Sequence, residues 1–239
     1  MDDERQMVEA MADLSNWKGV PAPQRVVIEG RYTRLEPLDP ARHGDELYAA
    51  ISGPDAGRLH EWLPDPVPAS RGDFDAWLVA KAASEDPLFH AVIDKRTGRV
   101  EGRQSIMDIN TVHGSAEIGH ILWGPAISRT RVTTEAFYLI ANHAFELGYR
   151  RWQWRCNARN TPSRNAAKRL GYRFEGVFRN HMVVKGQSRD TAWFSITDAE
   201  WPRIRSGFEA WLDPGNFDAD GNERSKLDVR QADVPAGDG

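Results

Sequence analysis

The stretch from Ala116 to Gly148 constrains the fold of this chain more than any other. Bulky apolar side chains over residues 117–123 favour a buried strand. Gly124-Pro125 ends that strand, because proline has no N–H to donate to a central ladder. From residue 133 the apolar side chains recur at helical spacing until Gly148, a typical C-terminal cap. The sequence therefore predicts a strand, a polar loop and a helix in direct succession.

The polar loop between them reads Ser128-Arg129-Thr130-Arg131. Free backbone N–H groups at a helix N-terminus form an anion site, and the two arginines add charge to it. An ordinary connection with solvated arginines is the alternative. The local charge favours the anion site: residues 129–173 hold ten basic and two acidic residues, a net charge of +8 in a chain of net charge −4. Such a block suggests a polyanionic ligand.

Composition limits the classes of protein that this chain can belong to. Its 239 residues, 40% of them hydrophobic, suit one medium domain with a core. No apolar run approaches the roughly 20 residues of a membrane span, and the acidic N-terminus lacks the layout of a signal peptide. A lone Cys156 excludes an internal disulfide and a cysteine-based zinc site, and we expect it to be buried filling. We expect a cytoplasmic protein with no metal and no membrane partner.

The order of the expected elements predicts a mixed α/β sheet with helices on both faces. We expect a leader over 1–25, a domain over 26–212 and a flexible polar tail over 213–239. The loop over 53–68 is either a substrate-facing lid or a packed connection. The other expected elements are a strand at 31–38, helices at 40–51 and 70–83, a hairpin of 88–94 with 99–108, a strand at 151–157, a helix at 161–170, strands at 172–178 and 191–196, and a helix from an Asp198 cap to 212.

This order and three sets of motifs resemble the GNAT superfamily of acyl-CoA N-acyltransferases, particularly its RimJ/RimL-like branch, over residues 31–196. The motifs are Ala116-Glu117-Ile118-Gly119 leading to Pro125 and Thr134-Glu135-Ala136, then Asn160-x-x-Ser163 opening a helix that ends Arg169-Leu170-Gly171-Tyr172, and Phe174-Glu175-Gly176. The resemblance implies a mixed, mostly antiparallel twisted sheet. Its central strand pair, 117–123 and 152–157, is expected to be splayed, with helices on both faces.

The resemblance also implies that the loop before the Thr-Glu-Ala helix binds the pyrophosphate of acetyl-CoA. The family pattern is glutamine or arginine, two residues, glycine, one residue, then glycine or alanine. Its matching positions here are Ser128, Arg131 and Thr133, so the glycine pattern is broken. Glycine permits unusual dihedrals, whereas arginine offers a charged fork for phosphate oxygens. We expect Arg129 or Arg131 to take over part of the pyrophosphate binding; a different donor, or none, is the alternative.

Further donor contacts follow from the same resemblance, since the pantetheine arm lies between the splayed strands. Asn160 matches a position that orients the arm, although it equally suits a helix cap. The implied cofactor-binding residues are Ile121, Trp123, Ser128, Arg129, Thr130, Arg131, Val132, Thr133, Thr134, Asn157, Asn160 and Arg164.

The family reaction is direct attack of an amine on the thioester, which needs a base for the ammonium proton and an acid for the departing thiolate. Glu117 stands at the general-base strand; the alternative is a glutamate paired with an arginine. Ser163 matches a position near the donor sulfur and is the candidate acid, or else a simple helix-start serine. His120 and His181 are candidate bases near neutral pH, although a lone histidine is more often structural. Asp190 and Trp193 are expected to shape the acceptor side.

Three functions are consistent with the sequence. The first is acetyl-CoA-dependent N-acetylation of a small-molecule or peptide amine. The second is an acyltransferase of the same fold whose donor is an aminoacyl-tRNA or a carrier-protein thioester, which the missing glycines and the basic block favour. The third is a catalytically silent binding module. An exposed last strand or helix could support a homodimer.

Overall fold

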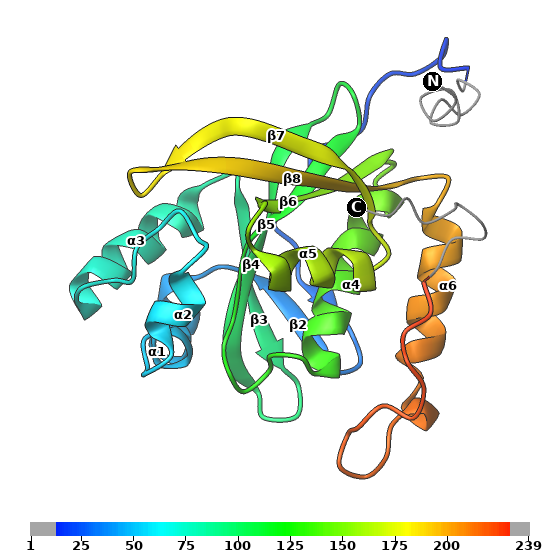
Figure 1. The fold of residues 1–239 in the computed structure, drawn as a ribbon. Coiled ribbons are helices and arrows are strands. Elements are labelled where there is room, and N and C mark those ends of the chain that lie inside the picture. Colours follow the sequence, from blue (N-terminus) through cyan, green and yellow to red (C-terminus); the bar gives the residue numbers. More distant parts are fainter. Residues whose placement is uncertain (1–12, 230–239) are drawn as a thin grey trace.

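One eight-stranded sheet organises residues 13–229, the part of the chain that the computed structural model describes (Figure 1). The strand order is β1-β2-β3-β4-β5-β6-β8-β7, and every neighbouring pair is antiparallel except β5 with β6. The strands are β1 (Ile28–Glu29), β2 (Thr33–Pro37), β3 (Leu88–Asp94), β4 (Arg99–Asn110), β5 (Ser115–Trp123), β6 (Arg151–Asn157), β7 (Arg173–Val184) and β8 (Gln187–Thr197).

Helices cover both faces of this sheet (Figure 1), and a separate hydrophobic core lies between the sheet and the helices on each face. The smaller core lies under α1 (Pro40–Ile51) and α3 (Arg71–Ala83), with the short α2 (Ala56–His60) beside them. The larger core lies under α4 (Arg131–Glu146), α5 (Thr161–Arg169) and α6 (Trp201–Trp211). The predicted mixed, mostly antiparallel sheet with helices on both faces is confirmed.

The two central strands part shortly after they begin. The parallel ladder between β5 and β6 joins Ser115 to Arg151 and ends where Glu117 faces Gln153. A bulge on β5 follows, and His120 within it adopts a left-handed φ of 49°. A bulge bends its strand and raises the local twist, so β5 turns away from β6 just beyond Glu117. This confirms the predicted splayed pair.

Several element boundaries differ from the sequence prediction. Helix α4 begins at Arg131 behind a Thr130 cap, two residues early, and α2 forms inside the expected loop. Strands β7 and β8 continue into a long hairpin, because their outer halves pair with each other rather than burying an apolar face. Asp198 does not cap α6, which starts at Trp201.

The β7–β8 hairpin arches over the α1–α3 side of the sheet (Figure 1). At its tip, Lys185 Nζ donates a hydrogen bond of 2.9 Å to the backbone carbonyl of His60 at the end of α2. β7 is also the last strand at this edge of the sheet. A homodimer through such a strand stays a prediction.

The segment after α6 is packed rather than frayed as far as residue 229. Phe217 and Val229 are buried in the larger core. The segment also packs closely on α6 at Gly207: the backbone oxygen of Asp228 occupies the space that a Cβ atom on residue 207 would need. The prediction of a flexible tail is therefore wrong for 213–229, and residues 230–239 lie outside the described part.

In the expected leader, Trp17 Nε1 donates a 2.7 Å hydrogen bond to the Val112 carbonyl. Residues 1–12 of the leader lie outside the described part.

Glu135 ties the start of α4 to the first strands. Its buried carboxylate accepts backbone hydrogen bonds from Arg31 at 2.9 Å and from Tyr32 and Thr33 at 2.6 Å each. The glutamate of the Thr-Glu-Ala motif therefore holds the β1–β2 turn against the helix that follows the polar loop.

Within residues 13–229, none of the helices has the length and apolar character needed to cross a membrane.

Candidate active site

Glu117 lies on β5 at the last pair before the strands part, and its side chain is almost wholly buried. Arg155 Nε on β6 lies 2.8 Å from Glu117 Oε2, and Arg155 also forms an ion pair with Asp108 on β4. The guanidinium faces the carboxylate as an ion pair, and the backbone N–H of Arg155 also favours the charged carboxylate. Burial raises the pKa of Glu117 to about 8, against the opposing charge of Arg155. A carboxylate that titrates there suits a general base.

Ser163 lies at the start of α5, on the other side of β6. Its hydroxyl oxygen accepts a hydrogen bond of 3.0 Å from Trp154 Nε1. Asn160 is the N-cap of this helix, and its Oδ1 accepts the Ser163 N–H at 3.1 Å. Asn160 therefore has the capping role that the sequence left open.

Alternation along β6 explains how the two candidate catalytic groups are arranged. Trp154 and Cys156 point toward α5, whereas Arg155 points to the opposite face and lies over the ring of Trp193 on β8 at 5.3 Å. The Cys156 thiol interacts with the hydroxyl of Ser163 by a hydrogen bond and with the charge of Glu117 at longer range. Burial raises the pKa of this thiol, which fits the expected filling role. Glu117 and Ser163 therefore lie on the two elements next to β6, with Cys156 as the residue of β6 that interacts with both.

Tyr172 is a member of this group that the sequence analysis did not single out. Its hydroxyl is fully buried and has no hydrogen-bond partner among residues 13–229. Burial, reinforced by the charge of Glu117, raises the pKa of Tyr172 well above its ordinary range. Arg155 was also missed as a functional residue. The alternation of residues 151–157 puts Arg155 on the polar face of the strand, and this pattern could have indicated a functional role. Its contact with Glu117, however, depends on tertiary structure.

The polar loop before α4 retains the features of an anion site without glycine. Among residues 13–229, the backbone N–H groups of Arg129, Arg131 and Thr133 have no hydrogen-bond partner. Arg129 adopts a left-handed φ of 61°, a conformation that glycine usually supplies. Thr130, which follows, is extended, so the chain turns at Arg129 directly before the first residue of the helix. Thr130 uses its hydroxyl locally, donating to Ile127 and accepting from Val132.

The two arginines of the loop behave differently. Arg129 is exposed, and its side chain has no contact partner in the described part of the chain. Arg131 stacks on Tyr32 at 4.3 Å and on Phe217 at 5.1 Å, measured to the ring centroids. The packed segment after α6 therefore engages Arg131, and of the two predicted phosphate ligands only Arg129 is free.

The remaining residues expected to bind the donor have local partners. Ile121 packs against the larger core. The other contacts are Trp123 Nε1 to Gln104 Oε1 at 3.3 Å, Asn157 Oδ1 accepting the Arg159 N–H at 3.0 Å, Arg164 Nη1 to the Ala158 carbonyl at 3.4 Å, and Thr133 and Thr134 hydroxyls to the Thr130 carbonyl at 3.0 and 3.4 Å. Ser128 is exposed at the tip of the loop.

His120 does not titrate near neutral pH as the sequence suggested. Its ring packs on Phe89 at 5.1 Å, and burial together with the charge of Arg103 lowers its pKa to about 4. Arg103 Nη1 donates a 2.7 Å hydrogen bond to the His120 carbonyl and holds the bulge in place. The imidazole is neutral at physiological pH, because a buried position disfavours its charged form.

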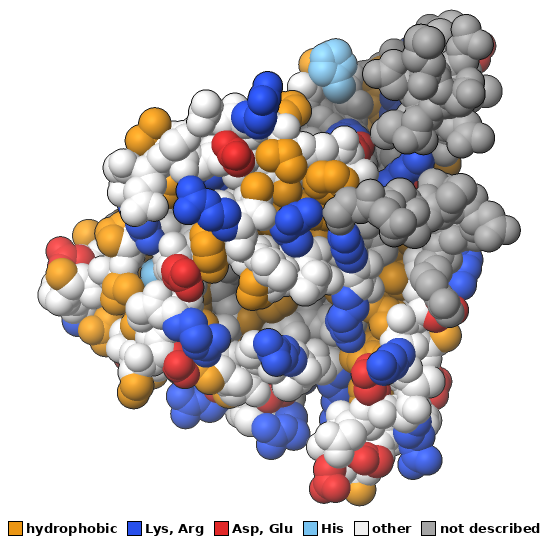
Figure 2. Space-filling model, viewed as in Figure 1, with side chains coloured by type: hydrophobic (Ala, Val, Ile, Leu, Met, Phe, Trp, Pro, Cys, Tyr) orange, Lys and Arg blue, Asp and Glu red, His pale blue; other side chains and the backbone are white. Residues whose placement is uncertain are grey.

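His181 lies on β7, on the face toward which Arg155 points. Its Nδ1 is 3.1 Å from the hydroxyl of Thr191, and its ring contacts Phe178 at 5.4 Å and Trp193 at 6.0 Å. Residues 178–181 line a shallow surface hollow of about 650 Å³. Asp190 has a structural role, since its Oδ1 accepts the Asn180 N–H at 2.7 Å. In Figure 2 hydrophobic side chains gather over this hairpin.

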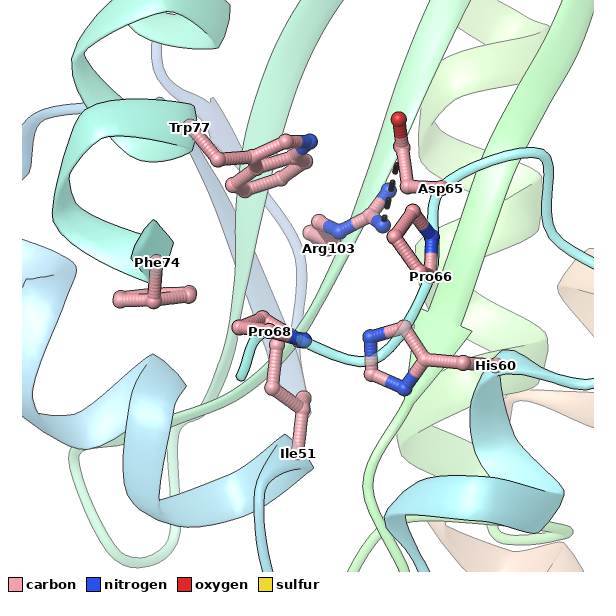
Figure 3. Close-up of a pocket in the computed structure, with 8 residues that line it drawn as sticks. All are labelled: Ile51, His60, Asp65, Pro66, Pro68, Phe74, Trp77 and Arg103. Atoms are coloured by element: carbon pink, nitrogen blue, oxygen red, sulfur yellow. Dashed lines mark ion pairs between the residues drawn. The ribbon is translucent and has the colours of Figure 1, made fainter. Parts of the chain in front are cut away.

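The loop over 53–68 is a packed connection in this structure. Trp77 lies over the guanidinium of Arg103 at 4.5 Å, and Asp65 faces that guanidinium from the loop at 4.0 Å (Figure 3). The cavity left between them is only about 20 Å³, close to the size of one water molecule. Its other lining residues are Ile51, His60, Pro66, Pro68 and Phe74.

Most of the basic block is engaged within the protein. Arg151 pairs with Glu175 on β7, Arg150 with Asp198, and Arg169 stacks on Trp211 at 5.4 Å. Basic side chains are scattered over the face in Figure 2 rather than gathered in one stripe. This arrangement gives little support to a polyanionic macromolecule as ligand. Among residues 13–229, no group of three or more His, Cys, Asp or Glu side chains is placed to hold a metal ion.

Comparisons with known proteins agree with this geometry. The model of the Acetyltransferase (GNAT) domain family matches residues 33–173. The crystal structure of a GCN5-related N-acetyltransferase from Brucella melitensis is 52% identical, with a TM-score of 0.88 over 90% of this chain and 97% of that chain. A probable acetyltransferase of the GNAT family from Chromobacterium violaceum ATCC 12472 is 38% identical, with a TM-score of 0.75 over 82% and 98%.

A more distant structure shares the fold. RimL, a ribosomal L7/L12 alpha-N-protein acetyltransferase, is 16% identical to this chain in its apo crystal form, with a TM-score of 0.63. The match covers 75% of this chain and 99% of that chain. No curated protein matches the chain.

Proposed function

Because the chain belongs to the GNAT family of acetyltransferases, we propose that it moves the acetyl group of acetyl-CoA to a primary amine by direct attack. The observation that carries this proposal is the place of Glu117. It is a buried carboxylate with a pKa of about 8 at the point where β5 and β6 part. A base with that pKa is half ionised near pH 8, where its charged form can accept a proton from an ammonium group.

The start of α4 supplies the donor site in this proposal. The free N–H groups of Arg129, Arg131 and Thr133 bind the pyrophosphate, and the exposed guanidinium of Arg129 adds a charged contact. The pantetheine arm lies between β5 and β6, whose ladder stops at Glu117 and Gln153. Beyond that pair, the strand edges offer unpaired backbone groups to the amides of the arm.

The chemistry then needs one proton acceptor and one proton donor. Glu117 takes a proton from the ammonium group, and the amine nitrogen attacks the thioester carbonyl carbon. After the attack the nitrogen loses its second proton to solvent; the C–S bond then breaks, and the departing thiolate takes a proton. Ser163 is our candidate donor of that proton, which it regains from solvent; its hydrogen bonds with Trp154 and Cys156 support this role. Tyr172, with its buried and unpartnered hydroxyl, is the second candidate for this step.

The test is a calorimetric titration with acetyl-CoA, followed by an assay of thiol release with a panel of primary amines. We expect micromolar binding, weaker in Arg129→Ala, and turnover that is lost in Glu117→Gln while acetyl-CoA binding remains. Absence of acetyl-CoA binding would contradict the proposed donor and return attention to aminoacyl-tRNA or carrier-protein donors. Binding without turnover of any amine would instead indicate a silent binding module.

A further inference from the structure

Arg189 on β8 is a half-buried cation that the proposed reaction has not yet used. Its Nε is buried and makes no hydrogen bond, and within residues 13–229 its side chain has no ion pair or ring contact. By contrast, Arg155 faces Glu117, and Arg103 donates to the His120 carbonyl and faces Asp65. A guanidinium withdrawn from water normally has an acceptor, because desolvation without one is costly. Arg189 therefore lacks a partner that a ligand could provide.

Strand register places Arg189 on the face of the sheet that carries Arg155. β8 pairs with β6 through Trp193 opposite Arg155 and Thr191 opposite Asn157, and Arg189 lies two residues before Thr191 on the same face. Its charge also acts on Arg155 and Glu117. The backbone carbonyl of Asp190, the next residue, accepts the Ala158 N–H just past the end of β6. Arg189 therefore lies just past the end of β6, on the face of the sheet that carries Arg155 and Trp193.

The donor does not supply the missing anion in the proposed binding mode. Its phosphates are held at the start of α4, beyond Trp123 at the far end of β5 from Glu117. Between the phosphates and the thioester, the pantetheine arm carries no charge. The positive charge of Arg155 is already shared between Glu117 and Asp108. An anion for Arg189 must therefore arrive with the acceptor.

We propose that Arg189 binds the carboxylate of the acceptor, and that the acceptor is a free α-amino acid with an apolar or aromatic side chain. This inference rests on the proposed function. In an α-amino acid the carboxylate is two bonds from the amine, so it reaches Arg189 while the amine faces Glu117. The side chain then lies against Phe178 and His181, which line the hollow on the hairpin, and against Trp193, whose ring contacts both.

The experiment compares each amino acid with its amide, which keeps the amine and side chain but removes the negative charge. Rates of thiol release from acetyl-CoA are measured for the twenty amino acids and their amides, beginning with phenylalanine and phenylalanine amide. We expect the wild-type protein to prefer the free acid by roughly tenfold or more in kcat/KM. Arg189→Met should remove this preference mainly through KM. Because Arg189 also lowers the pKa of Glu117, acid and amide are compared at the same pH, and the ratio of their kcat/KM values is the readout.

Two further variants sharpen the comparison. Arg189→Lys keeps the charge but not the planar fork, so an intermediate preference is expected. Arg173→Met removes the same charge near the opposite end of the hairpin, where Arg173 faces Ser195, and should leave the preference intact. Arg189→Met should also fold with an unchanged or higher Tm, because it relieves repulsion with Arg155.

Several results would overturn the inference. Equal use of acids and amides by the wild-type protein is one, and equal loss on both in Arg189→Met is another. A protein that binds acetyl-CoA but acetylates only peptides, or no amino acid at all, would also contradict it. These outcomes leave the donor assignment standing, whereas a protein that does not bind acetyl-CoA removes the proposed function and this inference with it.

Discussion

Arg155 Nε lies 2.8 Å from Glu117 Oε2, so the carboxylate at the parting of β5 and β6 faces a cation that also pairs with Asp108. Two opposing effects meet at Glu117. Burial favours its neutral form and Arg155 favours its charged form, and burial dominates. The result is a carboxyl group that titrates in the neutral range, as a base for an amine requires.

Glu117→Gln should lower kcat by about 100- to 10,000-fold, the usual contribution of a general base. The wild-type rate should rise with pH through about 8, because Glu117 must lose its proton before it can accept one. Steady-state rates from acid to alkaline pH check both points, with acetyl-CoA affinity as the control for folding. A wild-type rate independent of pH across this range would contradict the assignment.

The same carboxyl group should make stability depend on pH. Its pKa in the folded protein is about 8, above its ordinary value of 4.5, so the folded state holds the proton more tightly. Its contribution to stability is therefore full below the ordinary value and is lost as pH rises through about 8. In thermal unfolding, Glu117→Gln should gain stability relative to wild type across this window; a constant difference would argue against it.

Arg155→Met should shift the pH–rate profile of the enzyme to higher pH. Arg155 lowers the pKa of Glu117, so removing its charge allows that pKa to rise further above 8. Arg155→Lys retains the positive charge and should produce a smaller shift. The midpoint of the rate profile is the quantity to compare, since a merely structural role would lower the rate without moving it.

Arg129→Gly should have opposite effects on stability and donor binding. Glycine adopts the left-handed φ of 61° without strain, so the free energy of unfolding should rise by about 1 kcal/mol. Acetyl-CoA affinity should fall roughly tenfold with the loss of a charged phosphate contact. Chemical denaturation and calorimetry measure the two effects. Unchanged affinity would show that the backbone N–H groups alone bind the phosphates.

Glu135→Ala should destabilise the fold by about 3 kcal/mol or more. Three backbone N–H groups would lose a buried charged acceptor, and each unsatisfied donor carries a desolvation cost. Glu146→Ala on the same helix is the control, because that side chain is exposed and accepts only from Asn142. Urea unfolding of both variants tests the difference, and equal destabilisation would show that Glu135 does not anchor the β1–β2 turn.

Local patterns in the sequence predicted much of this architecture. Apolar spacing identified the strand, loop and helix around residues 116–148, whereas the candidate roles of Glu117 and Ser163 followed from the resemblance to the GNAT family. The spacing had limits. It failed for the hairpin of β7 and β8, whose outer halves pair with each other away from the core. It also failed for residues 213–229, whose polar composition hides the two buried anchors Phe217 and Val229.

The sequence by itself determined the elements of the fold, because periodicity, caps and breakers act over a few neighbouring residues. Only the tertiary structure decided the chemistry of the site. The raised pKa of Glu117 depends on burial and on charges that reach it from β4, β6 and β8. The unpartnered state of Arg189 likewise depends on which side chains fold around it. Electrostatics and desolvation act through space, so residues distant in the chain set them.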